Sequence, residues 1–172
     1  MTDRRVDGIR LVEVAVPKPR PAYLDSPRMS GFMKYFSAAN VALFQLTGGA
    51  LGGKFRTPGN LRGFPVCLLT TRGRKTGEPR TKPLIYLADG ARIVLVASQN
   101  GMPRNPAWYL NLQAEPRVLI QTGRHRRRMR ARTADDKERA ELWPRMVELY
   151  PDYENYQSWT DRKIPVVICE PS

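Results

Sequence analysis

The sequence predicts an α+β domain, in which short antiparallel strands form a small barrel and helices are inserted between them. The main observation is a succession of short apolar runs, separated by turn residues, from Phe64 onward. Such runs predict strands over 65–71, 82–88, 92–98, 118–121, 124–132 and 164–169. Helical spacing interrupts them twice, after a predicted cap at Asn105 and Pro106 and after a predicted capping box of Thr133 and Asp136. A length of 172 residues suits one such domain with a substantial core.

The residues before the barrel have a different pattern. Residues 9–16 alternate between polar and apolar types, which predicts an edge strand, and the prolines that follow predict a stiff, extended tether. Ser26 and Pro27 then form a typical helix start, and Gly48 and Gly49 a helix end. We therefore divide the chain into an extended segment, an amphipathic helix and the barrel domain, over 1–27, 28–50 and 51–172.

The predicted N-terminal helix carries an apolar stripe, made of Met29, Phe32, Met33, Phe36, Leu43 and Phe44. Such a stripe either packs a helix onto its own domain or lies in a membrane interface, where anionic lipid attracts basic residues. Next to it, Gly48, Gly53 and Lys54 have the spacing of a phosphate-binding P-loop. Phe55 stands where that loop needs a metal-binding Ser or Thr, so we exclude a nucleotide triphosphatase.

A net charge of +13 is the most unusual property of the composition. It predicts a polyanionic partner, which is nucleic acid, an anionic membrane surface or a small ligand with several negative charges. Cys67 and Cys169 lie in apolar runs without metal-ligand or redox spacing, which indicates buried thiols in a reducing compartment. Neither a signal peptide nor a membrane-spanning run is found, so we expect a cytoplasmic protein.

The residue inventory excludes several kinds of catalysis. His125 is the only histidine and lies among arginines, so a catalytic triad or a histidine-based metal site lacks its parts, and no metal is expected. Asp135 and Asp136 lie at a predicted helix start, where the helix dipole already favours carboxylates. If the protein is an enzyme, we expect a bound cofactor to supply the chemistry.

The segment between the first two predicted strands is rich in cations. It contains Gly73 and Gly77, whose freedom to take positive φ suits a tight hairpin. Its cations, with Glu78 as the only acid among them, are Arg72, Arg74, Lys75, Arg80 and Lys82. Arginine holds phosphate through paired hydrogen bonds and lysine as a point charge, so this tip suits an anion. A solvated charged turn is the alternative interpretation.

Aromatic residues gather in two later segments. Trp108 and Asn111 share one face of the helix that starts after Asn105, and a helix N-terminus favours anions. Tyr150, Tyr153 and Tyr156 recur every third residue, which predicts a wall of phenol rings along a helix. Ordinary core explains Trp108 equally well. It is also the usual meaning of the tyrosine spacing, which Pro151 interrupts, but three phenol hydroxyls favour a pocket wall.

Four segments together resemble a known family. They are 71–80 (TRGRKTGEPR), 105–112 (NPAWYLNL), 143–162 (WPRMVELYPDYENYQSWTDR) and 164–171 (IPVVICEP), with Ala97 and Ser98 between the first two. In order and spacing they resemble the deazaflavin-dependent nitroreductase family of actinobacteria, from about Leu51 to the last residue. This resemblance implies a split β-barrel of the flavin-reductase-like, FMN-binding kind that uses coenzyme F-420.

The resemblance also implies site residues. The cofactor phosphate and acidic tail would be held by Arg74, Lys75, Thr76 and Arg80. The deazaflavin ring would be flanked by Thr81, Lys82, Pro83, Leu84, Ile85, Tyr86, Val96, Ala97, Ser98, Gln99 and Tyr153. The cofactor groove would be completed by Ala107, Trp108 and Asn111. The acceptor side would be lined by Ser98, Tyr150 and Tyr156, which with Tyr153 are the candidate catalytic residues.

Three departures from the family pattern concern the acceptor more than the cofactor. Lys82 stands where a relative has Asn, Gln99 where it has Lys, and Ile85 where an active-site Tyr can occur. Cofactor binding tolerates these changes, whereas they weaken the expectation that a nitroimidazole prodrug is activated. Because a deazaflavin has carbon at the reactive ring position, it is implied to act as a hydride carrier.

The function implied is hydride transfer from reduced F-420 to a menaquinone-like quinone or another planar acceptor, such as a nitroaromatic. Alternatives are a nucleic-acid-binding protein, favoured by the basic run 124–132, and a non-catalytic cofactor or lipid-surface carrier. No nucleic acid is expected, because aromatic residues are not interleaved with that run. The location expected is cytoplasmic, with peripheral contact at the inner, anionic face of the cell membrane as an option. The oligomeric state stays open.

Overall fold

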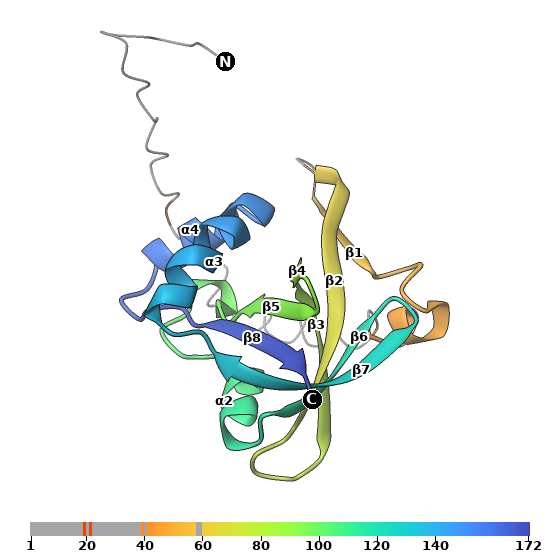
Figure 1. Ribbon diagram of the computed structural model, residues 1–172. Coiled ribbons are helices and arrows are strands. Elements are labelled where there is room, and N and C mark those ends of the chain that lie inside the picture. The colour runs from red at the N-terminus through yellow and green to blue at the C-terminus, as the bar shows by residue number, and fades with distance from the viewer. Residues whose placement is uncertain (1–18, 20, 22–38, 40, 58–59) are drawn as a thin grey trace, which may run out of the picture.

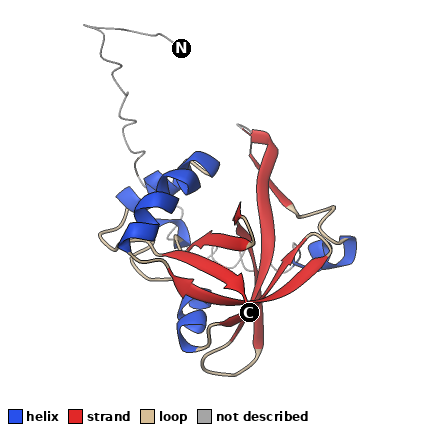
Figure 2. Ribbon diagram, in the orientation of Figure 1, coloured by secondary structure: helices blue, strands red, loops and turns tan. Residues whose placement is uncertain are grey.

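A computed structural model describes residues 19, 21, 39, 41–57 and 60–172. Within them the chain forms one eight-stranded antiparallel sheet that curls into a half-barrel (Figures 1 and 2). Its strands are β1 (Lys54–Thr57), β2 (Asn60–Arg72), β3 (Pro79–Ile85), β4 (Leu87–Asp89), β5 (Arg92–Val96), β6 (Arg117–Thr122), β7 (His125–Thr133) and β8 (Val166–Pro171). The helical elements are η2 (Gln99–Gly101), α2 (Ala107–Ala114), α3 (Asp136–Leu149) and α4 (Asp152–Ser158).

The strands follow the spatial order β1-β2-β6-β7-β8-β5-β4, and β3 pairs with β2 away from this path. The last strand, β8, therefore lies in the middle of the sheet between β7 and β5. The turn from β6 to β7 lies at Gly123, whose φ is +59°. The α+β architecture expected from the alternating runs is confirmed.

Two apolar clusters pack against opposite faces of the central strands. Leu95 and Ala97 face a cluster with α2, whereas Val94 and Val96 face a cluster with α3 and α4. Successive strand residues point to opposite sides, so these strands are apolar on both faces. Figure 1 shows α3 and α4 together beside β5 and β8, with α2 at the far end of the barrel.

The basic hairpin differs from its prediction in length. β2 runs from Asn60 to Arg72, longer than the predicted 65–71, and β3 spans Pro79–Ile85 and stops before the predicted residue 88. β4 is a separate strand, which pairs with β5. Pro83 is tolerated inside β3 because this strand has β2 as its one partner and needs no second row of donors.

Two predicted helix caps are wrong. The capping box of α3 is formed by Asp135 and Glu138, and the predicted pair Thr133 and Asp136 does not form it. Strand β7 continues through Thr133, which makes that residue part of the sheet. The N-cap of α2 is Pro106, because the side chain of Asn105 accepts a hydrogen bond from Arg162 instead.

The end of the predicted N-terminal helix is described, and residues 41–47 are helical. Phe44 is fully buried against Val66 and Leu68, while Leu43 is 43% exposed. Gly48 and Gly49 end the helix with positive φ. Most of the predicted helix 28–50 and of the segment 1–27 lies outside the described residues. Among the residues that are described, no helix is both long and apolar enough to cross a membrane.

Candidate functional site

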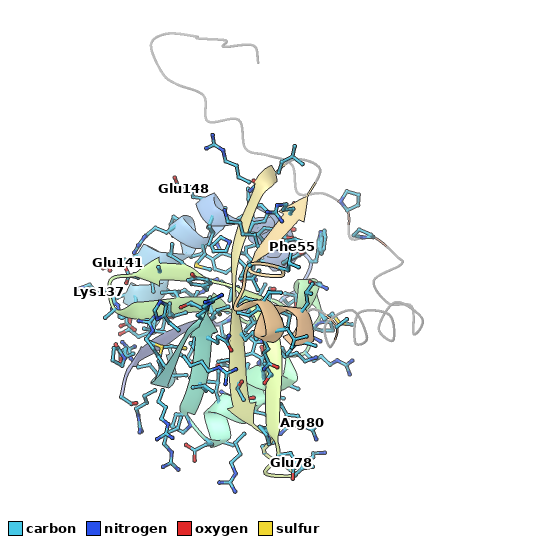
Figure 3. The ribbon with its side chains drawn as sticks, turned by 90° about the vertical axis from the view of Figure 1, so that its right-hand side faces the viewer. Phe55, Glu78, Arg80, Lys137, Glu141 and Glu148 are labelled. Atoms are coloured by element: carbon cyan, nitrogen blue, oxygen red, sulfur yellow. The ribbon has the colours of Figure 1, made fainter. Side chains whose placement is uncertain are left out.

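The tip of the β2–β3 hairpin is a tight loop of exposed cations. Gly77 has a φ of +72°, and its N–H donates to the Gly73 carbonyl at 2.7 Å. Gly73 itself does not have positive φ, contrary to the expectation; a Cβ there would lie 3.0 Å from the Thr76 hydroxyl. The predicted anion-binding side chains are all exposed: Arg74, Lys75, Thr76 and Arg80. Figure 3 shows Arg80 beside Glu78 at this tip.

A buried amide joins the basic tip to helix α2. Asn111 is 6% exposed, and its Nδ2 donates to the Thr71 hydroxyl at 3.2 Å. Its Oδ1 accepts a hydrogen bond from the backbone N–H of Arg74 at 3.2 Å. One side chain thus fixes the loop backbone relative to the helix. The sequence had placed Asn111 near the cofactor without indicating this role.

The run from Thr81 to Tyr86 divides between two faces of the sheet. Lys82 pairs with Leu69 and Leu84 with Cys67, so both point toward the α2 side. On the opposite face the Thr81 hydroxyl is 2.8 Å from that of Thr70, and Ile85 packs near Phe44. Residues on the α2 side are Arg80, Lys82, Leu84 and Tyr86, and those on the other are Thr81, Pro83 and Ile85.

The α2 side has an apolar floor. Ala97 and Trp108 belong to the buried cluster on this side, and Leu84 and Tyr86 pack against it. Trp108 is 8% exposed, whereas Ala107 at the start of the helix is exposed. Burial raises the pKa of Tyr86, so its phenol is protonated at neutral pH. Cations at the hairpin and an apolar floor therefore lie on one side of the same two strands.

The turn after β5 holds two residues in a rare conformation. Gln99 and Asn100 have φ of 50° and 53°, a region that non-glycine residues seldom adopt. The next residue, Gly101, is packed against α4: a Cβ there would be 2.8 Å from the Tyr156 carbonyl. This turn thereby brings half-buried Ser98 and Gln99 next to the tyrosine helix.

Arg162 fixes this turn and was missed by the sequence analysis. Its guanidinium donates to the carbonyls of Met102, Ala97 and Ser98 and to the Asn105 side chain, at 2.7–3.1 Å. Burial lowers the pKa of Arg162. Acceptors that are mostly backbone carbonyls leave no signature in side-chain spacing, so no pattern in the sequence pointed to this contact.

The three predicted tyrosines form one cluster. The ring of Tyr150 lies 5.0 Å from that of Tyr153 and 6.1 Å from that of Tyr156, and the Tyr150 and Tyr156 hydroxyls are 3.1 Å apart. Tyr150 and Tyr153 are 8% and 5% exposed. Burial raises the pKa of both, so the phenols stay protonated at neutral pH. Among the described residues, no hydrogen bond is found for the buried Tyr153 hydroxyl.

The aromatic cluster extends beyond the predicted residues. Phe64 lies 4.9 Å from Tyr150, ring to ring, and Phe55 lies 6.3 Å from Phe64. At the other end Trp159 is 5.4 Å from Tyr156. Phe55 was not predicted, because the β1–β2 hairpin that brings it opposite Phe64 was not recognised.

Two open cavities lie elsewhere on the sheet. Their volumes are about 530 and 450 Å³, and both are bordered by Arg128, Met129 and Ser172. The second also reaches Arg72 and Gly77 below the basic hairpin. None of the predicted site residues lines either cavity. His125 is exposed, and the described residues contain no group of three or more side chains arranged to hold a metal ion.

The curled sheet with inserted helices, a cationic hairpin and a phenolic wall defines a split-barrel protein of the cofactor-binding oxidoreductase class. Comparison with family models is consistent with this: residues 38–171 match the model described as F420H(2)-dependent quinone reductase. The match covers most of the chain, and the protein belongs to this family. The resemblance to deazaflavin-dependent enzymes is thereby confirmed.

Relatives from Mycobacterium tuberculosis support the assignment. Rv3178 of strain H37Rv is 46% identical over 121 residues, which is 70% of this chain and 98% of the relative. Rv1261c of the same strain, named F420H(2)-dependent quinone reductase, is 42% identical over 130 residues, which is 74% of this chain and 84% of its own.

Solved structures support the same fold. A structure named F420-H2 dependent reductase (FDR-A) is 41% identical with a TM-score of 0.58, over 62% of this chain and 94% of its own. A structure described as a domain-swapped dimer is 32% identical with a TM-score of 0.60, over 84% of this chain and all of its own.

Proposed function

We propose that this protein transfers a hydride from reduced coenzyme F-420 to a quinone. The observation that carries the proposal is the order of features along β2 and β3. Exposed cations lie at the hairpin tip, an apolar floor with Trp108 lies on the α2 side of these strands, and the tyrosine cluster meets β2 at Phe64 on the opposite face. A long, ring-bearing anion and a planar acceptor fit this order. Membership of the family supports the choice of cofactor and acceptor.

The residues present fit the cofactor. Arg74, Lys75 and Arg80 would neutralise its phosphate and acidic tail at the tip, with the loop held in place by Asn111. Its ring would lie on the floor formed by Leu84, Ala97 and Trp108, on the face that Lys82 and Tyr86 share, whereas Thr81, Pro83 and Ile85 lie on the other face of the sheet. When bound, the reduced deazaflavin supplies a hydride, which is two electrons with one proton.

The acceptor would bind on the tyrosine side. Ser98, Tyr153 and Tyr156 are the candidates to donate hydrogen bonds to a quinone oxygen, with Tyr150 orienting Tyr156 through the contact between their hydroxyls. The quinone takes up the hydride and one further proton from water through such a hydroxyl, and leaves as the hydroquinone. The raised pKa of the buried phenols keeps them in the protonated, donating form.

Location follows from the acceptor. We place the protein in the cytoplasm with peripheral contact at the inner membrane face, because a lipid-soluble quinone is reached there. Leu43 and Leu46 at the described end of the N-terminal helix are 43% and 86% exposed, which supports an apolar contact. A non-catalytic carrier would have no acceptor, so this alternative predicts that the protein binds the cofactor without turnover.

The test is a titration of the full chain with F-420, FMN and NADPH, followed by turnover with menadione. We expect micromolar binding of F-420 alone and oxidation of its reduced form by the quinone. The variant with Lys75→Gln and Arg80→Gln should bind F-420 at least tenfold more weakly. A variant with Arg128→Gln and Arg130→Gln removes the same charge from the exposed face of β7 and should retain affinity. Equal loss in both variants, or absence of F-420 binding, contradicts the proposal.

A further inference from the structure

Phe55 lies at one end of a continuous row of aromatic rings. Its ring centroid is 6.3 Å from that of Phe64 and 6.4 Å from that of Tyr150. Tyr150 in turn contacts Phe64 and Tyr153, at 4.9 and 5.0 Å. The row therefore links strand β1 directly to the tyrosines proposed to face the acceptor.

Exposure distinguishes Phe55 from the rings behind it. Its side chain is 42% exposed, whereas Phe64, Tyr150 and Tyr153 are all below 9%. Strand β1 pairs Phe55 directly with Phe64, so the two rings share one face of the hairpin. The buried rings support Phe55 from below, and its outer surface is left to solvent or to a ligand.

The place of Phe55 in the molecule is also informative. Figure 3 shows it well away from Arg80 and Glu78, which mark the anion-binding tip. Along β2, the partners of Arg80 and Phe55 are Thr71 and Phe64, which are about 23 Å apart at the usual rise of a strand. A ligand near Phe55 would meet the ring-bearing end of the site and not its anionic end.

We propose that Phe55 forms the outer wall of the acceptor site and stacks against the planar ring of the quinone. This inference rests on the proposed function and adds a specificity-determining residue to it. An uncharged aromatic face, supported by edge-on contacts from Tyr150, suits a neutral planar ring better than a charged or flexible acceptor. Phe55 makes no contribution to cofactor affinity, because the cofactor is held at the other end.

The experiment compares Phe55→Ala and Phe55→Trp with the wild type in steady-state reduction of menadione. We expect Phe55→Ala to raise KM for menadione by about three- to tenfold, the worth of one aromatic pair, with kcat nearly unchanged. Phe55→Trp should keep KM within about twofold, because it retains a planar face. The Kd for F-420 should be the same in all three proteins.

Leu61→Ala is the matched control, because Leu61 is an apolar side chain on the neighbouring strand with 78% exposure and makes none of these ring contacts. It should leave KM unaltered. Urea unfolding of Phe55→Ala should show a native-like midpoint, which separates a lost contact from a lost fold. An unchanged KM in Phe55→Ala overturns the role of Phe55 while the proposed function stands. Absence of turnover in the wild type overturns both.

Discussion

At the scale of single residues, the site depends on one buried amide. The buried amide of Asn111 forms hydrogen bonds with the Thr71 hydroxyl and the Arg74 backbone N–H. Breaking them would leave buried polar atoms without partners, so they hold the loop in position. The proposed anion-binding cations lie on either side of that anchor. Their preorganisation follows from a residue that carries no charge.

Replacing Asn111 with alanine should therefore affect both stability and affinity. We expect about 2 kcal/mol lower free energy of unfolding, because the Thr71 hydroxyl loses its buried partner. The Kd for F-420 should rise several-fold, since the loop loses its anchor. Urea unfolding and a fluorescence titration measure the two effects. Gln113→Ala on the exposed part of α2 is the control, and a similar loss there would remove the special role of Asn111.

Arg162 is a second residue with effects beyond its own position. Arg162→Met should lower the free energy of unfolding by about 2–4 kcal/mol, because several carbonyls lose a charged donor. Arg162→Lys should recover only part of the lost free energy of unfolding. Its ammonium group keeps the positive charge but cannot reach all these acceptors in one plane. We also expect reduced kcat in both variants, because the Ser98 turn loses its support. Denaturant unfolding and menadione turnover check these outcomes; a stable Arg162→Met protein would contradict them.

At the scale of elements, one carboxylate adds a polar link between helix α3 and the sheet against which the helix packs. Glu138 completes the capping box with Asp135 and accepts two hydrogen bonds from Arg132 on β7, at 2.6 and 2.7 Å. The hydrogen bonds from Arg132 and from the Asp135 backbone lower the pKa of Glu138 to about 2. A single side chain thus joins the helix start to the sheet.

This carboxylate should give a defined acid dependence. Because its folded pKa is depressed, its stabilising contribution is complete above the unfolded value near 4.5 and is lost as the pH falls toward about 2. Glu138→Gln should be less stable than the wild type at pH 7, and the difference should shrink as the pH falls toward about 2. Urea midpoints measured across this range test the prediction. Lys137→Gln, one residue away and exposed, should not change the difference.

The elements also show how far the sequence is informative. Alternating runs located most strands, and the glycines of the β6–β7 turn and the N-terminal helix end have the positive φ that the pattern required. The misplaced cap of α3 has a tertiary cause: β7 extends to Thr133 because Thr133 pairs with Val167. The spacing of neighbouring residues carries no information about a partner strand that is more than thirty residues away. The same holds for Arg162, whose acceptors lie far away in the sequence, and for the contact of Phe55 with Tyr150.

At the scale of the whole molecule, the sheet orders the proposed chemistry along one direction. The long strand β2 carries the proposed anion-binding tip at one end and the aromatic row near the other. A cofactor held by its charged tail at the tip would extend along β2 toward the end where the aromatic row lies. Affinity and acceptor choice are separated in space, so the two are expected to respond to different mutations.

The net charge of +13 makes a prediction at this scale. Binding of F-420 should weaken several-fold between low salt and about 0.5 M NaCl, because exposed charges are screened. The variant with Lys75→Gln and Arg80→Gln should lose most of this salt dependence. Titrations at several salt concentrations measure it. A salt slope equal to that of the wild type would show that the charge acts through the whole surface and not through the hairpin tip.

The central position of β8 bears on how the protein is made. Strands β5 and β7 have no direct pairing within the sheet and meet only through β8, whose residues Val166–Pro171 are synthesised after both. While the nascent chain is on the ribosome, the edges of those two strands must therefore wait unpaired, and aggregation is a risk during that interval. The many arginines of β7 are well placed to keep such an edge soluble until the sheet is joined.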